Sequence, residues 1–248
     1  MSRSILGLDV GGSSIKAGLV DVDTGEALTP LKSVPTPQPA TPEGVIGTIV
    51  EIDRSFGANG AVGLALPSVV QRGIARTAAN IDKSWLGANP AQLLGAKIGR
   101  PVACLNDADA AGLAEMRWGA GRDTRGVAIM LTFGTGIGSA LFTDGKLLPN
   151  TELGHLEIDG RDAETWASAR VRTAEALDWP AWAERVNVYL ASMHALFWPD
   201  LFILGGAVSE NFNAFAPLLQ SPAEIRAAAF AGQAGIMGAA LAASLAGE

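Results

Sequence analysis

Short apolar runs ending at glycine recur along the chain, and this pattern predicts buried β-strands. The first run ends in Gly11-Gly12-Ser13-Ser14 and is followed at once by another, so the two predict a hairpin. A turn at Asp23-Thr24-Gly25 then precedes a third strand. The two hairpin strands cover residues 4–10 and 15–22. The same pattern predicts further strands over residues 61–66, 102–105, 127–133, 137–142 and 201–204.

Helix signals lie between these runs. Four prolines from Pro35 to Pro42 enforce an extended connection, after which a helix can begin. We expect helices over residues 42–56, 107–118, 162–172 and 179–198, and a final one from about Gln233. Strands followed by helices, twice over, predict an α/β protein of two lobes with a cleft between them.

The second half of the chain opens in the same way as the first. Gly134-Thr135-Gly136 separates two apolar runs, as Gly11-Gly12 does near the N-terminus. Glycine lets the backbone approach a ligand closely, so two such turns could offer N–H groups to one polyanion. The alternative is two structural hairpin turns, since neither has the spacing of a dinucleotide fold or a P-loop.

Composition narrows the class of protein. Hydrophobic residues make up 48% of the chain, which excludes disorder, and a net charge of −7 argues against a nucleic-acid binder. The single cysteine, Cys104, permits no internal disulfide and indicates a reducing, cytoplasmic compartment. The uncharged stretch over residues 227–247 is rich in Ala and Gly, so we expect a buried helix there and no membrane contact.

Basic side chains are concentrated in the middle of the chain. Residues 72–125 carry a balance of +3, whereas residues 1–71 carry −3 and residues 126–248 carry −7. An anionic polymer needs a local basic track and not a basic protein. Arg117, Arg122 and Arg125 are the candidates for such a track, and scattered solvated charges are the alternative.

Asn106-Asp107 stands at the carboxyl end of a predicted strand, where ligands of open α/β sheets bind. An aspartate there can accept a proton from a hydroxyl that the neighbouring amide holds. Equally, Asp107 could cap the following helix. Glu152 and His155, followed by Glu164, make a weak metal pattern and fit polyol recognition better.

Together these motifs resemble the ROK (repressor, open reading frame, kinase) family of sugar kinases, in the actin-like ATPase superfamily. The resemblance is carried by Leu8–Asp21, Leu105–Asp107, Leu131–Gly138, Glu152–His155 and Leu204–Gly206. Within the family the chain looks like the polyphosphate-using glucokinases and glucomannokinases, through residues 77–85, 106–115 and 149–157. The resemblance implies an actin-like, ribonuclease H-like α/β fold with a central cleft between lobes of residues 1–105 (with about 234–248) and 106–233.

This resemblance implies a phosphotransferase that moves a phosphoryl group from inorganic polyphosphate to the 6-hydroxyl of glucose, with ATP left open as a second donor. Asp107 would take the hydroxyl proton, and Asp9 would hold Mg²⁺ through water. The implied sugar contacts are Asn80, Asn106, Asp107, Glu152, His155 and Glu164. The implied donor contacts are Asp9, Gly11, Gly12, Ser13, Ser14, Lys16, Thr132, Gly134, Thr135, Gly136, Gly205 and Gly206.

The chain departs from the family pattern in two places. Ordinary members carry a cysteine-rich zinc loop after the histidine, which this chain lacks, so no structural zinc is expected. Ser68 stands where relatives usually have glycine. Two alternatives stay open: an ATP-only hexokinase acting on glucose or mannose, and a non-catalytic, sugar-sensing member. Family likeness also implies a homodimer, and the closeness of Asp9 to the N-terminus leaves no room for a DNA-binding extension before it.

Overall fold

The computed structural model describes residues 3–247, and these fall into two compact units. Unit 1 contains the residues up to Ala114 and those from Gln233 onward, and unit 2 contains Glu115–Gly232. The expected division into lobes of residues 1–105 (with about 234–248) and 106–233 stays a prediction.

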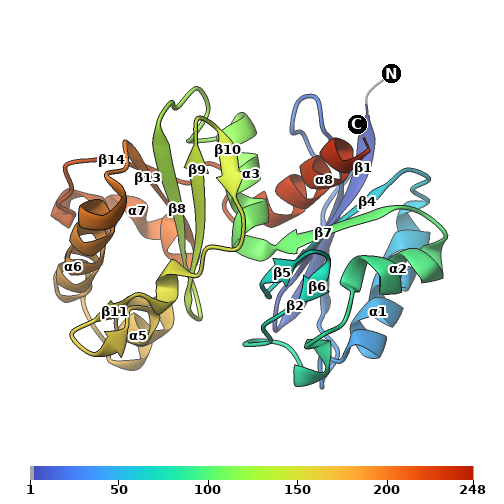
Figure 1. Ribbon diagram of the computed structural model, residues 1–248, viewed down its shortest axis with the longest axis horizontal. Helices are drawn as coiled ribbons and strands as arrows, with labels where there is room; N and C mark the ends of the chain where they lie inside the picture. Colours follow the sequence, from blue (N-terminus) through green and yellow to red (C-terminus); the bar gives the residue numbers. More distant parts are fainter. Residues whose placement is uncertain (1–2, 248) are drawn as a thin grey trace. The chain divides into compact units, whose positions relative to one another are not determined.

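Unit 1 is built on one five-stranded sheet (Figure 1). Its strands are β1 (Ser4–Val10), β2 (Ser14–Asp21), β3 (Lys32–Pro35), β4 (Val62–Leu66) and β7 (Val102–Asn106), beside a small hairpin of β5 (Val70–Gln71) and β6 (Ile74–Ala75). The order is β3-β2-β1-β4-β7, and β1, β4 and β7 are mutually parallel. The first hairpin is confirmed, whereas the third strand begins later than the turn at Asp23-Thr24-Gly25 suggested.

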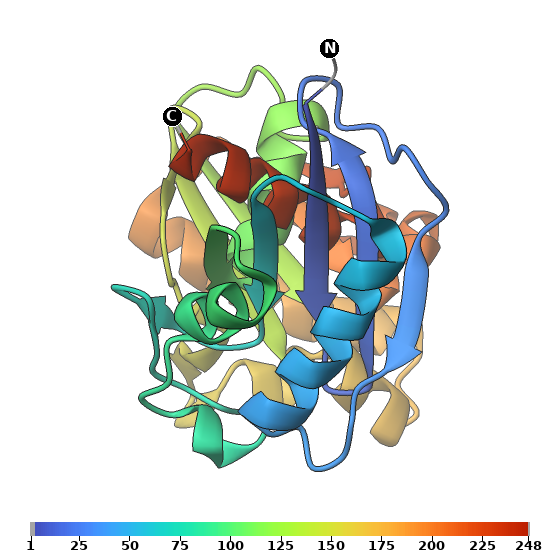
Figure 2. The same cartoon turned by 90° about the vertical axis from the view of Figure 1, so that its right-hand side faces the viewer.

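The helices of unit 1 lie on both faces of this sheet (Figures 1 and 2). They are α1 (Pro42–Phe56), the 3₁₀ turn η1 (Lys83–Trp85), α2 (Pro90–Ile98) and α8 (Ala234–Ala246), and α3 (Asp107–Trp118) begins here and ends in unit 2. The signals for α1 are local: Thr41 accepts a hydrogen bond from the Gly44 amide, and Gly57 ends the helix with φ 63°. Its predicted bounds are confirmed.

Helix α8 packs on the backbone of the sheet with almost no side chains between them. A Cβ atom on Gly7 would lie 2.0 Å from the Ile236 carbonyl oxygen, and one on Gly63 would lie 1.9 Å from that of Ala239. On its other contact, with α3, a Cβ on Gly238 of α8 would lie 1.6 Å from the Ala110 carbonyl oxygen. The uncharged C-terminal stretch is therefore a buried core helix, as predicted, and within residues 3–247 no helix is long and apolar enough to cross a membrane.

Unit 2 repeats the sheet of unit 1. Its strands are β8 (Val127–Phe133), β9 (Ile137–Thr143), β10 (Lys146–Leu148), β13 (Leu201–Gly206) and β14 (Glu224–Ala227), with a separate hairpin of β11 (Glu157–Ile158) and β12 (Arg161–Asp162). The order β10-β9-β8-β13-β14 is the order of unit 1, with an antiparallel meander followed by two parallel strands. The suspected repetition of one device is thus confirmed in the topology.

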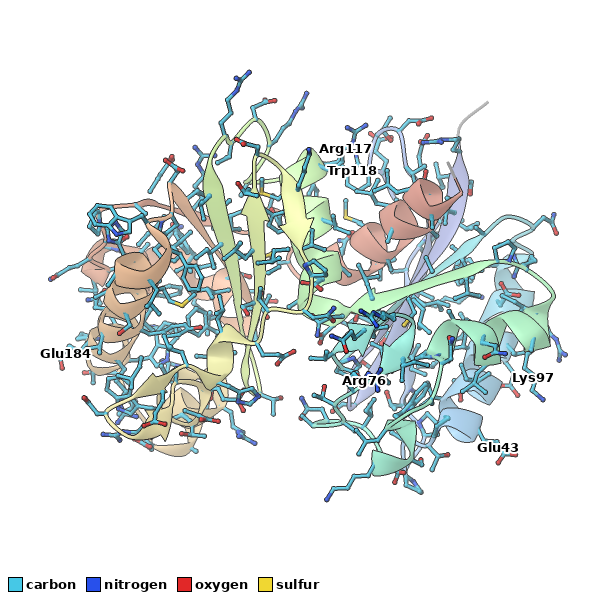
Figure 3. All side chains as sticks on the ribbon, viewed as in Figure 1. Glu43, Arg76, Lys97, Arg117, Trp118 and Glu184 are labelled. Carbon is cyan, nitrogen blue, oxygen red and sulfur yellow. The ribbon has the colours of Figure 1, made fainter. Side chains whose placement is uncertain are left out.

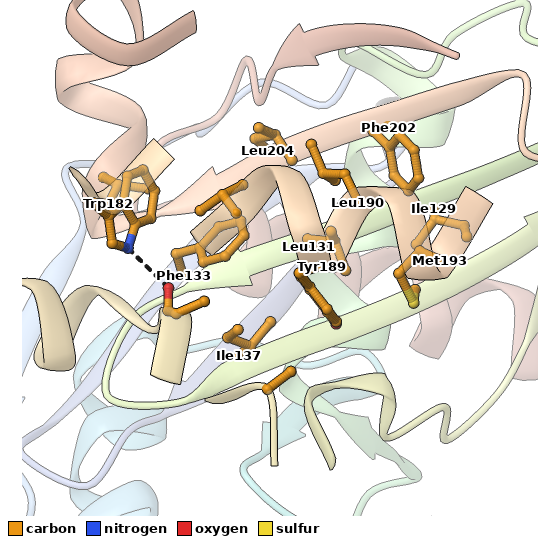
Figure 4. Close-up of a cluster of buried hydrophobic side chains, with 14 of the residues drawn as sticks. Ile129, Leu131, Phe133, Ile137, Trp182, Tyr189, Leu190, Met193, Phe202 and Leu204 are labelled. Atoms are coloured by element: carbon orange, nitrogen blue, oxygen red, sulfur yellow. Dashed lines mark hydrogen bonds between the residues drawn. The ribbon is translucent and has the colours of Figure 1, made fainter. Parts of the chain in front are cut away.

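The helical part of unit 2 packs on this sheet. Its elements are η2 (Leu153–His155), α4 (Glu164–Ala167), α5 (Ala169–Ala174), α6 (Trp179–Phe197), η3 (Ala207–Asn211), α7 (Phe212–Phe215) and η4 (Ala216–Leu218). Side chains of α6 cover β8 and β13 (Figure 4), and the Trp182 indole donates to the Ala167 carbonyl at 2.9 Å. These contacts hold the segments that carry the polar residues described below.

A single helix over residues 162–172 was expected, and this prediction is wrong. Asp162 lies in β12, and Ser168 separates α4 from α5 with extended backbone angles (φ −66°, ψ 161°). The buried Ser168 hydroxyl accepts from the Val171 amide, so it starts a new helix instead of continuing the old one. Hydrophobic periodicity does not reveal such a break.

The glycine contacts under α8 can be tested by denaturation. We expect Gly63→Ala to destabilise the protein by roughly 1–3 kcal/mol, because the added methyl group meets backbone that cannot move aside. Gly47→Ala, at an exposed position of α1 with open space around it, should stabilise the helix by about 0.5–1 kcal/mol. A shift in the urea midpoint for Gly63→Ala no larger than that for Gly47→Ala would contradict this packing argument.

Candidate functional site

In unit 1 the parallel strands end at one edge of the sheet, and the predicted polar residues follow those ends. The register pairs Asp9 with Ala65 across β1 and β4, and Leu66 with Asn106 across β4 and β7. Asn106 and the first glycine turn therefore stand at the same edge. Ser68 lies at this edge too, and its carbonyl accepts from the Asn106 amide at 3.3 Å.

The first glycine turn is held by hydrogen bonds to its carbonyl groups. Thr36 donates to the Gly11 carbonyl at 2.7 Å, and Gln38 donates to the Gly12 carbonyl at 3.0 Å. These hydrogen bonds partly neutralise the negative ends of the two carbonyl dipoles. The turn therefore repels an approaching anion less than it would with free carbonyls. Asn80 packs against the turn, since a Cβ on Gly12 would lie 2.9 Å from the Asn80 carbonyl oxygen.

Asp9 and Lys16 are directly opposite each other on β1 and β2. Burial raises the pKa of the Asp9 carboxyl, and the Lys16 charge opposes this shift. The first turn of α8 contributes to the burial, because a Cβ on Gly235 would lie 2.8 Å from the carboxylate carbon of Asp9. A partly buried carboxylate of this kind is stabilised by a nearby cation.

The helix-capping role that was considered for Asp107 falls chiefly to Asn106. The Asn106 side-chain oxygen accepts from the Ala108 amide at 2.8 Å and from the Asp109 amide at 3.1 Å. Asp107 also accepts from the Ala108 amide, at 2.9 Å, and its side chain stays partly exposed at the strand end. The arrangement leaves a carboxylate at the surface of this edge while its neighbour caps the helix.

In unit 2 the corresponding strand ends bring the second set of glycines together. The register pairs Thr132 with Gly205 across β8 and β13, so the turn Gly134–Gly136 lies beside Gly205 and Gly206. Gly206 is in close contact with strand β8, since a Cβ there would lie 2.4 Å from the Phe133 carbonyl oxygen. Gly206 and Thr135 are exposed at this edge, whereas Gly205 is buried against the Met130 side chain.

Glu152, His155 and Glu164 come together next to this turn. The His155 Nε2 atom lies 3.9 Å from a Glu152 carboxylate oxygen. Burial is the main reason that the pKa of Glu152 is raised, and the charge of Glu164 adds to it. Tyr189 supports the segment from beneath by donating to the Leu153 carbonyl at 3.0 Å. The cluster offers several hydrogen-bonding groups on one surface, as polyol recognition requires.

Asp162 belongs to this cluster and was missed as a site residue, because it was assigned to a helix. Its carboxylate lies 2.9 Å from His155 Nδ1 and is the largest cause of the raised pKa of His155. Desolvation opposes the shift, and the charges of Glu164 and Glu152 add to it. The signal was available in the sequence as a second carboxylate two residues before Glu164.

The arginines expected to form a polymer track lie elsewhere in unit 2. Arg117 is at the end of α3 (Figure 3), and Arg122 and Arg125 precede β8. The second glycine turn follows the other end of that seven-residue strand, and a strand of this length spans roughly 20 Å. Only a long polymer could contact both places, so the track stays a prediction.

The acidic residues do not form an evident metal centre. No group of three or more His, Cys, Asp or Glu side chains suited to hold a metal ion occurs among residues 3–247. A cation at this site would therefore share its ligands with water or with substrate, as Mg²⁺ commonly does.

Known proteins resemble this chain over nearly its whole length. A family model described as the ROK family matches residues 5–177. The polyphosphate glucokinase of Mycobacterium tuberculosis is 48% identical over 241 residues, which cover 97% of this chain and 91% of that protein.

Solved structures agree with this match. The inorganic polyphosphate/ATP-glucomannokinase of Arthrobacter sp. strain KM superimposes with a TM-score of 0.94 at 45% identity, covering 98% of this chain and 99% of that one. A ROK family glucokinase from Streptomyces griseus, in complex with glucose and AMPPNP, gives a TM-score of 0.85 at 26% identity, covering 98% and 100%. The predicted actin-like fold class is confirmed.

The pairing of Asp162 with His155 can be tested by NMR. We expect Asp162→Asn to lower the pKa of His155, because it removes the hydrogen-bonded charge that raises this pKa most. The chain has two histidines, so His194 serves as an internal reference in the titration. An unchanged His155 titration would show that the contact does not persist in solution.

This pair also makes stability depend on pH. A raised pKa in the folded state stabilises the protein fully below the unfolded histidine pKa of about 6.5, and the effect is lost as pH rises through the folded value. Asp162→Asn should therefore lower the melting temperature more near pH 6 than near pH 9. The difference should be modest, because both side chains are about half exposed.

Proposed function

The chain belongs to the ROK family, and we propose that it is a polyphosphate glucokinase. It transfers a phosphoryl group from inorganic polyphosphate to the 6-hydroxyl of glucose and so makes glucose 6-phosphate. Nearly full-length likeness to a polyphosphate glucokinase and to a polyphosphate/ATP-glucomannokinase supports this activity. ATP is the second donor that the name of the glucomannokinase suggests.

The observation that carries the mechanism is the position of Asp107. Its partly exposed carboxylate stands at the carboxyl end of β7, and Asn106 caps the helix that begins there. In the proposed step Asp107 accepts the proton of the sugar 6-hydroxyl as that oxygen bonds to the terminal phosphorus. The bond from phosphorus to the bridging oxygen breaks, leaving polyphosphate one phosphate shorter, or ADP.

The other predicted residues would position the two substrates. Asn80, Asn106, Glu152, His155 and Glu164 would hold the sugar hydroxyls. The glycine turns, with Ser13, Ser14, Lys16, Thr132 and Thr135, would hold the donor phosphates. Phosphoryl transfer depends chiefly on such positioning and on neutralising charge.

Magnesium is the cofactor that a kinase of this type generally uses. Asp9 would hold it through water, and its partial burial beside α8 fits a carboxylate that a cation stabilises. Bound there, Mg²⁺ would neutralise charge on the donor phosphates. We also propose a cytoplasmic location, which the single cysteine supports, and a homodimer, which rests on family likeness.

Donor choice separates the leading activity from the ATP-only alternative. Purified protein with glucose and magnesium should produce glucose 6-phosphate when supplied with long-chain polyphosphate, measured by a coupled assay. Activity with ATP but none with polyphosphate would favour the ATP-only hexokinase. Binding of glucose without turnover on either donor would favour a sugar-sensing protein. Mannose tested in parallel would define the sugar range.

Substitution of the proposed base gives a direct test. Asp107→Asn should lower kcat by roughly 10²- to 10⁴-fold, while glucose binding stays measurable by calorimetry. Glu43→Gln is a control that makes the same carboxylate-to-amide change at an exposed position of α1, and it should leave kcat unchanged (Figure 3). Normal turnover in Asp107→Asn would refute the assignment of the base.

The arginine track predicts an effect on one donor only. Replacing Arg117 and Arg122 with alanine should raise KM for long-chain polyphosphate by about 3-fold or more and leave KM for ATP nearly unchanged, since exposed ion pairs contribute about 0–1 kcal/mol each. Lys97→Ala removes an exposed charge from α2 and is the control (Figure 3). Equal losses with both donors would dismiss the track.

A further inference from the structure

Gly136 lies directly against a carboxylate of the sugar cluster. A Cβ on Gly136 would lie 2.2 Å from Glu164 Oε2, whereas one on Gly134 would meet nothing within 4 Å. Neither glycine lies in the left-handed region of backbone space, so conformation does not require glycine at either position. At Gly136 the missing side chain leaves the room that the Glu164 carboxylate occupies.

The backbone next to Gly136 is engaged by the same cluster. The Ile137 amide donates to Glu164 Oε2 at 3.3 Å. The Ile137 carbonyl is covered by the Glu152–His155 segment, since a Cβ on Gly154 would lie 2.1 Å from its oxygen. Two motifs that are far apart in sequence therefore contact the backbone on both sides of Ile137, the residue that follows the second glycine turn.

The other end of the turn is held by the helix that follows α4. The Arg170 amide, in the first turn of α5, donates to the Gly134 carbonyl at 3.0 Å. Glu164 begins α4, so the short stretch from Glu164 to Arg170 contacts both ends of the turn. The conformation of the glycine turn therefore depends on the position of Glu164.

We propose that Gly136 is a positioning residue for the Glu164 carboxylate and not a donor contact, so that the Gly136 side of this turn serves the sugar while Gly134 and Thr135 serve the donor. This inference rests on the proposed function, since it takes Glu164 as a sugar-binding group. A carboxylate on the Ile137 amide also repels phosphate, which disfavours a polyanion at that edge of the turn. Glycine at position 136 thus contributes to glucose affinity.

The pKa of His155 depends on where the Glu164 carboxylate lies. The hydrogen bond to Asp162 is the largest cause that raises the pKa of His155, and the Glu164 charge adds to it. Burial is the largest cause that raises the pKa of Glu152; the charge of His155 opposes this shift and that of Glu164 adds to it. Moving the Glu164 carboxylate away should lower the pKa of His155 even in protein without substrate. The His155 titration is therefore a readout that does not depend on activity.

Gly136→Ala is suited to the test because the clashing atom is the end of a flexible side chain. Glu164 can rotate away, so the fold should survive and the carboxylate should move. We expect KM for glucose to rise roughly 10- to 100-fold, the size of a lost hydrogen bond to a charged group, with KM for polyphosphate changed much less. The pKa of His155 should fall.

Gly134→Ala is the matched variant in the same turn. It should leave the glucose KM and the His155 titration as in the natural protein, whatever it does to the donor KM. A double-mutant cycle adds Glu164→Ala: with no carboxylate to displace, Gly136→Ala should then have little further effect on the glucose KM. Thermal melting of each variant checks that it is folded.

The outcomes separate this inference from the proposed function. If the natural protein phosphorylates glucose but Gly136→Ala raises only the donor KM, or if the two substitutions are additive, the inference is overturned. If the natural protein lacks kinase activity, the proposed function fails, and the His155 titration still decides whether Gly136 positions Glu164. An unchanged titration in folded Gly136→Ala would also overturn it.

Discussion

Contact between α8 and the backbone of the first sheet is the constraint on which unit 1 depends. Gly7 and Gly63 leave no side chain at the closest points, so helix and strands touch through their main chains, and Gly238 does the same between α8 and α3. This contact also places Gly235 against the Asp9 carboxylate. The last helix of the chain thereby buries a charged group near its beginning, and burial raises the pKa of that group.

The repeated sheet explains why candidate site residues occur in two sets. In each unit an antiparallel meander precedes two parallel strands, and turns at the carboxyl ends of the strands carry the polar groups. At one such end the Asn106 side chain caps the following helix, and the Asp107 carboxylate beside it stays partly exposed. In unit 2 the Ile137 amide, next to the glycine turn, donates to Glu164, and Gly154 covers the Ile137 carbonyl.

Residues whose roles depend on neighbours in sequence were the ones that could be predicted. Thr41, Pro42 and Gly57 define the ends of α1 by local hydrogen bonding and backbone angles, and the bounds of that helix were correct. The same holds for β8 and for α3. The break at Ser168 was missed because a hydroxyl can continue or start a helix, and packing around the buried Ser168 decides which.

The sequence alone determined the central strands of both sheets, helices α1, α3, α6 and α8, the two glycine turns and the kinds of chemical group available, because these follow from local periodicity and from residue type. Only the tertiary structure decided which groups meet. Asp162 reaches His155, Glu164 lies on Gly136, and Gly235 lies on Asp9 because strand pairing and helix packing bring together segments that local patterns treat as separate. Such contacts depend on distances across the fold, which no spacing along the chain encodes.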